Sequence, residues 1–132
     1  MTCRILIVED QPLIAMTLED AVIELGHELV GVAACKADAL SLGETADVAL
    51  VDVFVLDGPT GPDIGRALAE TDVSVLFMTG NPEELGDGIP GTLGVISKPF
   101  LDLEAVQAIQ YATDKQAQRH AIAPARLVEF SS

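Results

Sequence analysis

The stretch Ile5-Leu6-Ile7-Val8-Glu9-Asp10 decides the fold, because an apolar run of strand length ends in two adjacent carboxylates. Three later segments repeat this arrangement, each with a different polar ending. Residues 48–51 run into Asp52, residues 73–78 into Thr79, and residues 93–97 into Lys98. Short runs that are apolar throughout are typical of strands buried on both faces of a parallel sheet. If four such strands lie side by side, carboxylates, a hydroxyl and an ammonium meet at one edge.

Helices are expected between these strands. The apolar periodicity predicts helices over 12–25, 36–45, 64–70 and 101–119, and a further strand over 27–34. Strict alternation of strand and helix predicts an α/β domain with helices on both faces of a parallel sheet. Right-handed crossovers then favour a doubly wound, flavodoxin-like sheet of five parallel strands in the order 2-1-3-4-5. We assign residues 1–119 to this domain and residues 120–132 to a tail.

The segment 80–91 departs from this regular alternation. It holds four glycines and two prolines in twelve residues, so at most one helical turn, near 82–85, fits there. The helix expected at this place in the fold is therefore short or disordered. The tail has no clear period, and its apolar residues pack back on the domain, form a dimer contact or stay disordered.

The charge balance excludes several classes of function. The chain of 132 residues carries 21 acidic and 7 basic residues, a net charge of −14. Direct nucleic-acid binding needs basic residues to neutralise phosphates, so we do not expect it. The apolar runs are far shorter than the ~20 residues of a membrane span, and no signal-peptide pattern opens the chain. We expect a cytoplasmic protein with Cys3 and Cys35 as reduced thiols.

Three carboxylates predict a cation site. Glu9 and Asp10 alone are explained equally well as acids that favour a helix N-terminus. Asp52 changes this balance, because the order of the sheet places it beside them at the same edge. Three adjacent carboxylates repel one another unless a cation joins them, and Mg²⁺ prefers such oxygen ligands.

The other strand ends indicate phosphoryl chemistry. Asp52, at the end of a buried strand beside a metal, is well placed as a nucleophile towards phosphorus, and Asp57 is a second choice. Thr79 can donate its hydroxyl to a phosphoryl oxygen. Lys98 precedes Pro99, and a cis bond there would aim its ammonium over the site to offset developing negative charge. Taken singly, each residue has a plainer explanation as a turn acid or a solvated strand end.

With these residues the chain resembles a receiver domain of two-component response regulators over residues 3 to about 117. The resemblance rests on Glu9-Asp10, on Asp52 with Asp57-Gly58 beyond it, on Phe77-Met78-Thr79-Gly80 and on Lys98-Pro99-Phe100. It implies that Asp52 is the phospho-acceptor and that Glu9, Asp10, Asp52 and the Phe54 carbonyl hold Mg²⁺. Thr79 and Lys98 would bind the phosphoryl oxygens. The donor would be a histidine kinase or a histidine phosphotransfer protein.

Two departures from the family pattern affect how the signal would leave the site. Val95 stands where many receivers carry an aromatic residue that moves inward on activation. The loose segment 80–91 resembles a minority group of single-domain receivers with an aromatic-x-Thr-Gly motif. We read 80–91 either as a plain surface loop or as a switch that becomes ordered when Thr79 engages phosphate. The bulky Phe54 would shield the phosphorus from water and give a long-lived acyl phosphate.

The expected output is a protein contact or a phosphorelay, since no output domain follows the last helix. We expect an unidentified downstream protein, a monomer or weak dimer, and no enzyme activity beyond the chain's own phosphorylation and dephosphorylation. The alternative is a receiver fold that binds proteins whether or not it is phosphorylated. A phosphohydrolase of haloacid-dehalogenase type is disfavoured, because Phe54 stands where a second aspartate is needed. A flavodoxin is disfavoured by the acidic first loop.

Overall fold

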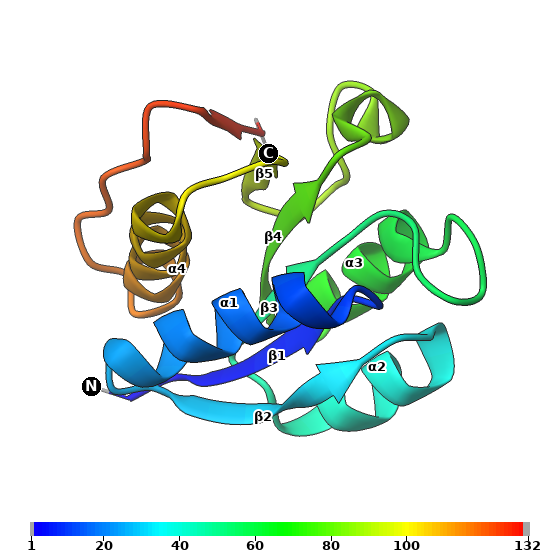
Figure 1. The fold of residues 1–132 in the computed structure, drawn as a ribbon, viewed down its shortest axis with the longest axis horizontal. Coiled ribbons are helices and arrows are strands. Elements are labelled where there is room, and N and C mark those ends of the chain that lie inside the picture. The colour runs from blue at the N-terminus through cyan, green and yellow to red at the C-terminus, as the bar shows by residue number, and fades with distance from the viewer. Residues whose placement is uncertain (1, 131–132) are drawn as a thin grey trace.

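The computed structural model describes residues 2–130 and shows a six-stranded sheet between two layers of helices (Figure 1). The strands are β1 (Arg4–Val8), β2 (Glu28–Ala33), β3 (Val48–Val51), β4 (Ser74–Thr79), β5 (Gly94–Ser97) and β6 (Leu127–Glu129). The helices are α1 (Pro12–Glu24), α2 (Lys36–Leu42), α3 (Gly61–Ala69) and α4 (Asp102–Gln116), with 3-10 turns η1 (Gly43–Thr45) and η2 (Pro82–Leu85).

The strand order is β2-β1-β3-β4-β5-β6. The first five strands are parallel, which confirms the predicted doubly wound order. The sixth strand was not predicted. β6 pairs antiparallel with β5, so residues 127–129 of the tail pack back on the domain, one of the three alternatives that the sequence left open.

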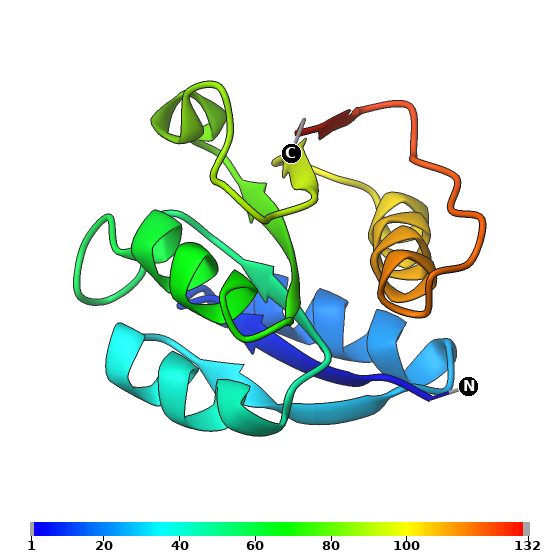
Figure 2. The ribbon, with the colours of Figure 1, turned by 180° about the vertical axis from the view of Figure 1, so that it is seen from behind.

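The two faces of the sheet carry separate apolar cores. On one face, Leu18 and Val22 of α1 and Ala108 and Ile109 of α4 pack with residues of the central strands. On the other face, visible from behind in Figure 2, α2 and α3 pack with Leu6, Val51 and Phe77 among others. This arrangement holds the sheet rigidly and leaves its carboxyl-terminal edge free for polar side chains.

Helix boundaries follow local chemistry. α1 begins at Pro12 and ends just before Gly26, whose φ of 80° reverses the chain as expected of a helix stop. α3 begins at Gly61, three residues earlier than predicted, at a position where only a residue without a Cβ fits. A Cβ on Gly61 would collide with the backbone oxygen of Asp52.

The segment 80–91 is short but not structureless. Its only regular element among the described residues is η2, at the place where one turn was expected. Leu85 and Ile89 are buried against the core of the α2–α3 face. Within residues 2–130, no helix combines the length and apolar character needed to cross a membrane. Cys3 and Cys35 are free.

Candidate functional site

Three carboxylates meet where β1 and β3 end. The two strands are neighbours in register, Val8 beside Val51, so the residues directly after them emerge at one edge. One carboxylate oxygen from each of Glu9, Asp10 and Asp52 lies within 4.8 Å of the others. Glu9 and Asp52 are buried, with 3% and 7% of their surfaces exposed, whereas Asp10 is half-buried. The predicted acidic cluster is therefore assembled.

Lys98 reaches into this cluster from β5, on the other side of β4. Its Nζ lies 2.7 Å from Glu9 Oε1 and 2.8 Å from Asp52 Oδ2. The Lys98-Pro99 peptide bond is cis, one of the two readings that the sequence left open. One ammonium thus bridges two buried carboxylates, although it cannot balance all three.

The pKa values of Glu9 and Lys98 are shifted by burial and by the ion pair between them. Burial raises the pKa of the Glu9 carboxyl above its usual range, and Lys98 opposes the rise through its hydrogen bond and its charge. For Lys98, burial lowers the pKa, but hydrogen bonds to Asp52 and Glu9 outweigh it and raise the pKa above the usual value. The ammonium therefore stays charged at neutral pH.

Asp52 is held on both sides. Its Oδ1 accepts a hydrogen bond of 2.7 Å from the Val53 amide, and its Oδ2 accepts the one from Lys98. The backbone N–H of Gly61 donates to the carbonyl of Val53, so the start of α3 packs against this turn. The nearby Phe54 side chain is 41% exposed, which leaves it at the rim of the site.

Thr79 ends β4 and is fully buried at the same edge. Its carbonyl accepts a hydrogen bond of 2.9 Å from the Lys98 amide, so the two residues that would read phosphate are joined through the backbone. Its Oγ1 accepts an N–H from Asn81, 3.1 Å away, at the start of the segment 80–91. If the Thr79 hydroxyl took another hydrogen-bond partner, its bond to the Asn81 N–H would change, and with it the start of that segment. Its ordering on phosphorylation stays a prediction.

Asp57, the second choice as acceptor, is used elsewhere. Its Oδ1 accepts a hydrogen bond from Thr60, and its Oδ2 accepts the Lys36 amide at the start of α2. These bonds, the one from Lys36 first, lower the pKa of the Asp57 carboxyl. The structure gives Asp57 the role of a turn acid.

Sequence reasoning missed one contact in the site. Gln11 was not among the predicted site residues, and its side chain does not cap α1. Its side-chain Oε1 accepts a hydrogen bond of 3.3 Å from Lys98 Nζ, and its backbone N–H donates to Glu9 Oε2. Its place directly after Glu9-Asp10 was the available signal.

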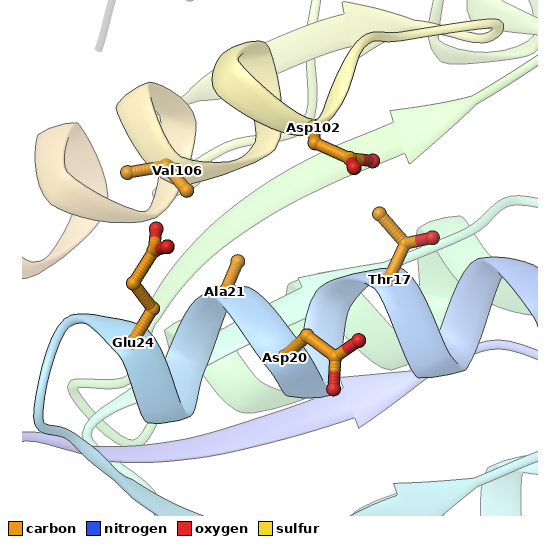
Figure 3. A pocket seen from close by; sticks show the side chains of 6 residues that line it. All are labelled: Thr17, Asp20, Ala21, Glu24, Asp102 and Val106. Atoms are coloured by element: carbon orange, nitrogen blue, oxygen red, sulfur yellow. The ribbon is translucent and has the colours of Figure 1, made fainter.

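A second acidic surface lies between α1 and α4, away from this edge. A hollow of about 130 Å³ is lined there by Thr17, Asp20, Ala21, Glu24, Asp102 and Val106 (Figure 3). Figure 3 shows the carboxylates spread along the two helices, with Glu24 facing Val106. They do not converge as those of Glu9, Asp10 and Asp52 do.

Comparison with known proteins decides the family. No protein-family model matches the chain. A solved structure of the receiver domain of the response regulator PhyR from Erythrobacter litoralis is 33% identical, with a TM-score of 0.77, over 92% of this chain and 97% of that domain. The chain belongs to the response-regulator receiver domains. This confirms the resemblance and the flavodoxin-like fold.

Two further relatives are longer than this receiver domain. It is 39% identical over 105 residues to the phyllosphere-induced regulator PhyR of Methylorubrum extorquens, covering 76% of this chain and 39% of that protein. It is 30% identical to a structure described as the anti-anti-sigma factor PhyR of Bartonella quintana, with a TM-score of 0.67 over 89% of this chain and 48% of that one. The receiver domain thus spans less than half the length of both.

Proposed function

We propose that this receiver accepts a phosphoryl group on Asp52, in a reaction that depends on Mg²⁺, from a histidine kinase or a histidine phosphotransfer protein. One observation carries the proposal: a single ammonium, Lys98 Nζ, bridges the buried carboxylates of Glu9 and Asp52 at the edge where Thr79 also ends its strand. Asp10 adds a third carboxylate to this edge, which one ammonium cannot neutralise.

The chemistry follows from the residues. A carboxylate oxygen of Asp52 attacks the phosphorus of a phosphohistidine, and a P–O bond forms as the P–N bond breaks. The imidazole nitrogen keeps the electron pair and takes up a proton. Lys98 moves from the free carboxylate to the phosphoryl oxygens and offsets their charge, and the Thr79 hydroxyl donates to another of these oxygens.

The donor set fits Mg²⁺. Three carboxylates with oxygens within 4.8 Å of one another carry more negative charge than Lys98 neutralises, and all are hard oxygen ligands. Glu9, Asp10, Asp52 and the Phe54 carbonyl would hold the ion. When bound, it would neutralise charge on the transferred phosphoryl group.

The kinase and the downstream partner would meet apolar side chains around the site. Leu13, Met16, Leu56 and Leu101 are more than half exposed, and they follow the strand ends that carry the acids and Lys98. Exposed apolar side chains at these places would favour contacts with other proteins. We propose a cytoplasmic monomer or weak dimer whose phosphorylated form binds a downstream protein or passes the phosphate on. It would catalyse only its own phosphorylation and dephosphorylation.

The test is phosphorylation by acetyl phosphate with Mg²⁺, followed by mass spectrometry of the intact protein. Wild type should gain one acid-stable, base-labile phosphoryl group, and Asp52→Asn should gain none. Asp57→Asn is the matched control, because it removes a neighbouring carboxylate that serves the turn, and it should still be modified. An unmodified wild type, or an adduct that survives in Asp52→Asn, would favour the alternative of a receiver that acts without phosphorylation.

A further inference from the structure

Arg126, in the tail just before β6, makes a dense set of contacts with the loop that carries Lys98. One of its guanidinium nitrogens lies 2.8 Å from the Ser97 carbonyl, and the other lies 3.1 Å from the Pro99 carbonyl. The second nitrogen also donates to both carboxylate oxygens of Glu104, at 3.0 and 2.9 Å. Ser97 and Pro99 flank Lys98 in the sequence, and α4 begins shortly after them.

The position of Arg126 is fixed by more than these bonds. β6 pairs with β5 through Leu127, Val128 and Glu129, and Leu127 is buried. The Tyr111 hydroxyl of α4 donates to Glu129 at 2.6 Å. Figure 1 shows the tail passing along α4 and returning beside β5. These contacts hold the tail, and with it the guanidinium, beside β5.

Glu104 completes the connection to α4. Its Oε1 also accepts the Leu101 amide at 2.8 Å, which caps the start of the helix. Because Glu104 neutralises the charge of Arg126, the guanidinium acts on the Lys98 loop through geometry rather than through a long-range field. A planar group with several donors suits this task better than a single ammonium.

We propose that Arg126 is a positioning residue for Lys98. The Lys98 backbone is held from the sheet by its amide bond to Thr79 and from the tail by Arg126 at the flanking carbonyls. Together these bonds fix where the ammonium enters the acidic cluster. The inference rests on the proposed function, because Lys98 matters only if it reads a phosphoryl group.

The expected effect is a selective loss of phosphoryl recognition. Removing the guanidinium frees the Lys98 loop on one side, and a displacement of about 1 Å can cost up to ~100-fold in such a site. For Arg126→Ala we expect beryllofluoride, a phosphoryl analogue, to bind about 10-fold more weakly in the presence of Mg²⁺. The affinity for Mg²⁺ alone should stay unchanged or rise, because its ligands do not touch Arg126 and Lys98 competes for them.

Three variants distinguish the hydrogen-bonding geometry of Arg126 from its charge and from a general loss of structure. Arg126→Ala removes the guanidinium altogether. Arg126→Lys keeps the charge and one bond but cannot span two carbonyls and Glu104, so it should recover only part of the affinity. Arg119→Ala is the matched control. It removes another arginine near the tail, whose exposed ion pair with Asp114 lies away from the site, and it should behave as wild type.

The ammonium signal of Lys98 in the metal-free protein supplies a readout that does not depend on phosphorylation. In NMR spectra of the side-chain amines, the Lys98 ammonium protons should exchange slowly with water in wild type. In Arg126→Ala they should exchange too fast to give a separate signal. Wild-type behaviour of Arg126→Ala in both measurements would overturn the inference and leave the proposed function intact. A parallel loss of Mg²⁺ and beryllofluoride affinity would also overturn it, since it would indicate general damage. A wild type that binds no beryllofluoride would instead refute the proposed function, while the NMR comparison still tests the placement of Lys98.

Discussion

The two edges of the parallel sheet, where the strands begin and where they end, differ in how many charged groups they bring together. At the amino-terminal edge, polar groups pair with one another: Arg4 forms a 2.9 Å ion pair with Glu28, and the Arg4 amide donates to Asp47 at 2.8 Å. At the carboxyl-terminal edge, three carboxylates share one ammonium. Exposed pairs such as Arg4–Glu28 contribute only about 0–1 kcal/mol. Arg4 thus makes an exposed ion pair of small effect at one edge, whereas at the other edge a single ammonium leaves negative charge that a divalent cation would balance.

Within the carboxyl-terminal edge, the segments that leave the strands differ in regularity. After β1 the chain enters α1 almost at once, so Glu9 and Asp10 lie directly before a helix. After β3, residues 52–60 intervene before α3 begins at Gly61, whose N–H donates to the Val53 carbonyl next to Asp52. After β4 the chain enters the irregular segment 80–91, and the Lys98 loop after β5 is held by the tail through Arg126. The half of the site that carries the acceptor is thus followed by α1 and α3, and the half that would bind phosphate is followed by the segment 80–91 and by the loop that Arg126 contacts.

The largest effect is expected from removing the one cation of the functional edge. Lys98→Ala should lower the rate of phosphorylation by acetyl phosphate about 100-fold, since a preorganised group that stabilises transition-state charge contributes on that order. The rate is measured by mass spectrometry over time with saturating Mg²⁺. Because Glu9 and Asp52 then lose their partner, the metal-free variant should also unfold at a lower temperature, and Mg²⁺ should recover part of the loss.

Arg4→Ala is the control for this change, because it removes a cation from the opposite edge. Its phosphorylation rate should equal that of wild type. Equal rates for Lys98→Ala and wild type would contradict the claim that the cation at the carboxyl-terminal edge serves phosphorylation.

A smaller effect is expected at the rim of the site. Phe54→Asn should speed the loss of the phosphoryl group about 10-fold, because a polar side chain two residues after the acceptor can orient water where Phe54 excludes it. The lifetime is followed after removal of acetyl phosphate, and wild type should keep the group for hours. Leu56→Asn, which alters a more exposed apolar residue nearby, should leave the lifetime unchanged. A wild-type lifetime of seconds would contradict this explanation.

Most of the fold and the members of the site could be predicted because they depend on local patterns. Apolar runs with polar endings specify parallel strands, and their order brings the endings together whatever the details of packing. The single turn at 82–85 followed from glycine and proline content alone.

The contacts made by the tail could not be predicted in the same way. β6 has three residues, too few for a periodic signal, and it forms only because β5 offers a free edge. Arg126 acts on carbonyls 27 and 29 residues away, and nothing in its neighbouring sequence indicates which backbone it meets. Gln11 was not predicted as a site residue, because nothing in its residue type indicates a contact with Lys98, 87 residues away.

The smallest effect is expected at the amino-terminal edge. His27 Nδ1 accepts the Cys3 amide at 3.0 Å, which requires a neutral imidazole, and burial lowers the pKa of His27 below its ordinary value. The folded state then binds fewer protons than the unfolded state, so this stability is complete above the unfolded pKa and is lost as pH falls through the folded pKa. In urea unfolding at pH 7.5 and 5.5, wild type should lose more stability than His27→Gln, whose side-chain carbonyl accepts the same N–H without titrating. His120→Gln, at an exposed position, should lose as much as wild type. Both variants should be phosphorylated at the wild-type rate, because the amino-terminal edge takes no part in the chemistry. An equal loss for His27→Gln and wild type would show that this contact does not titrate, and a slower phosphorylation would show that the two edges are coupled.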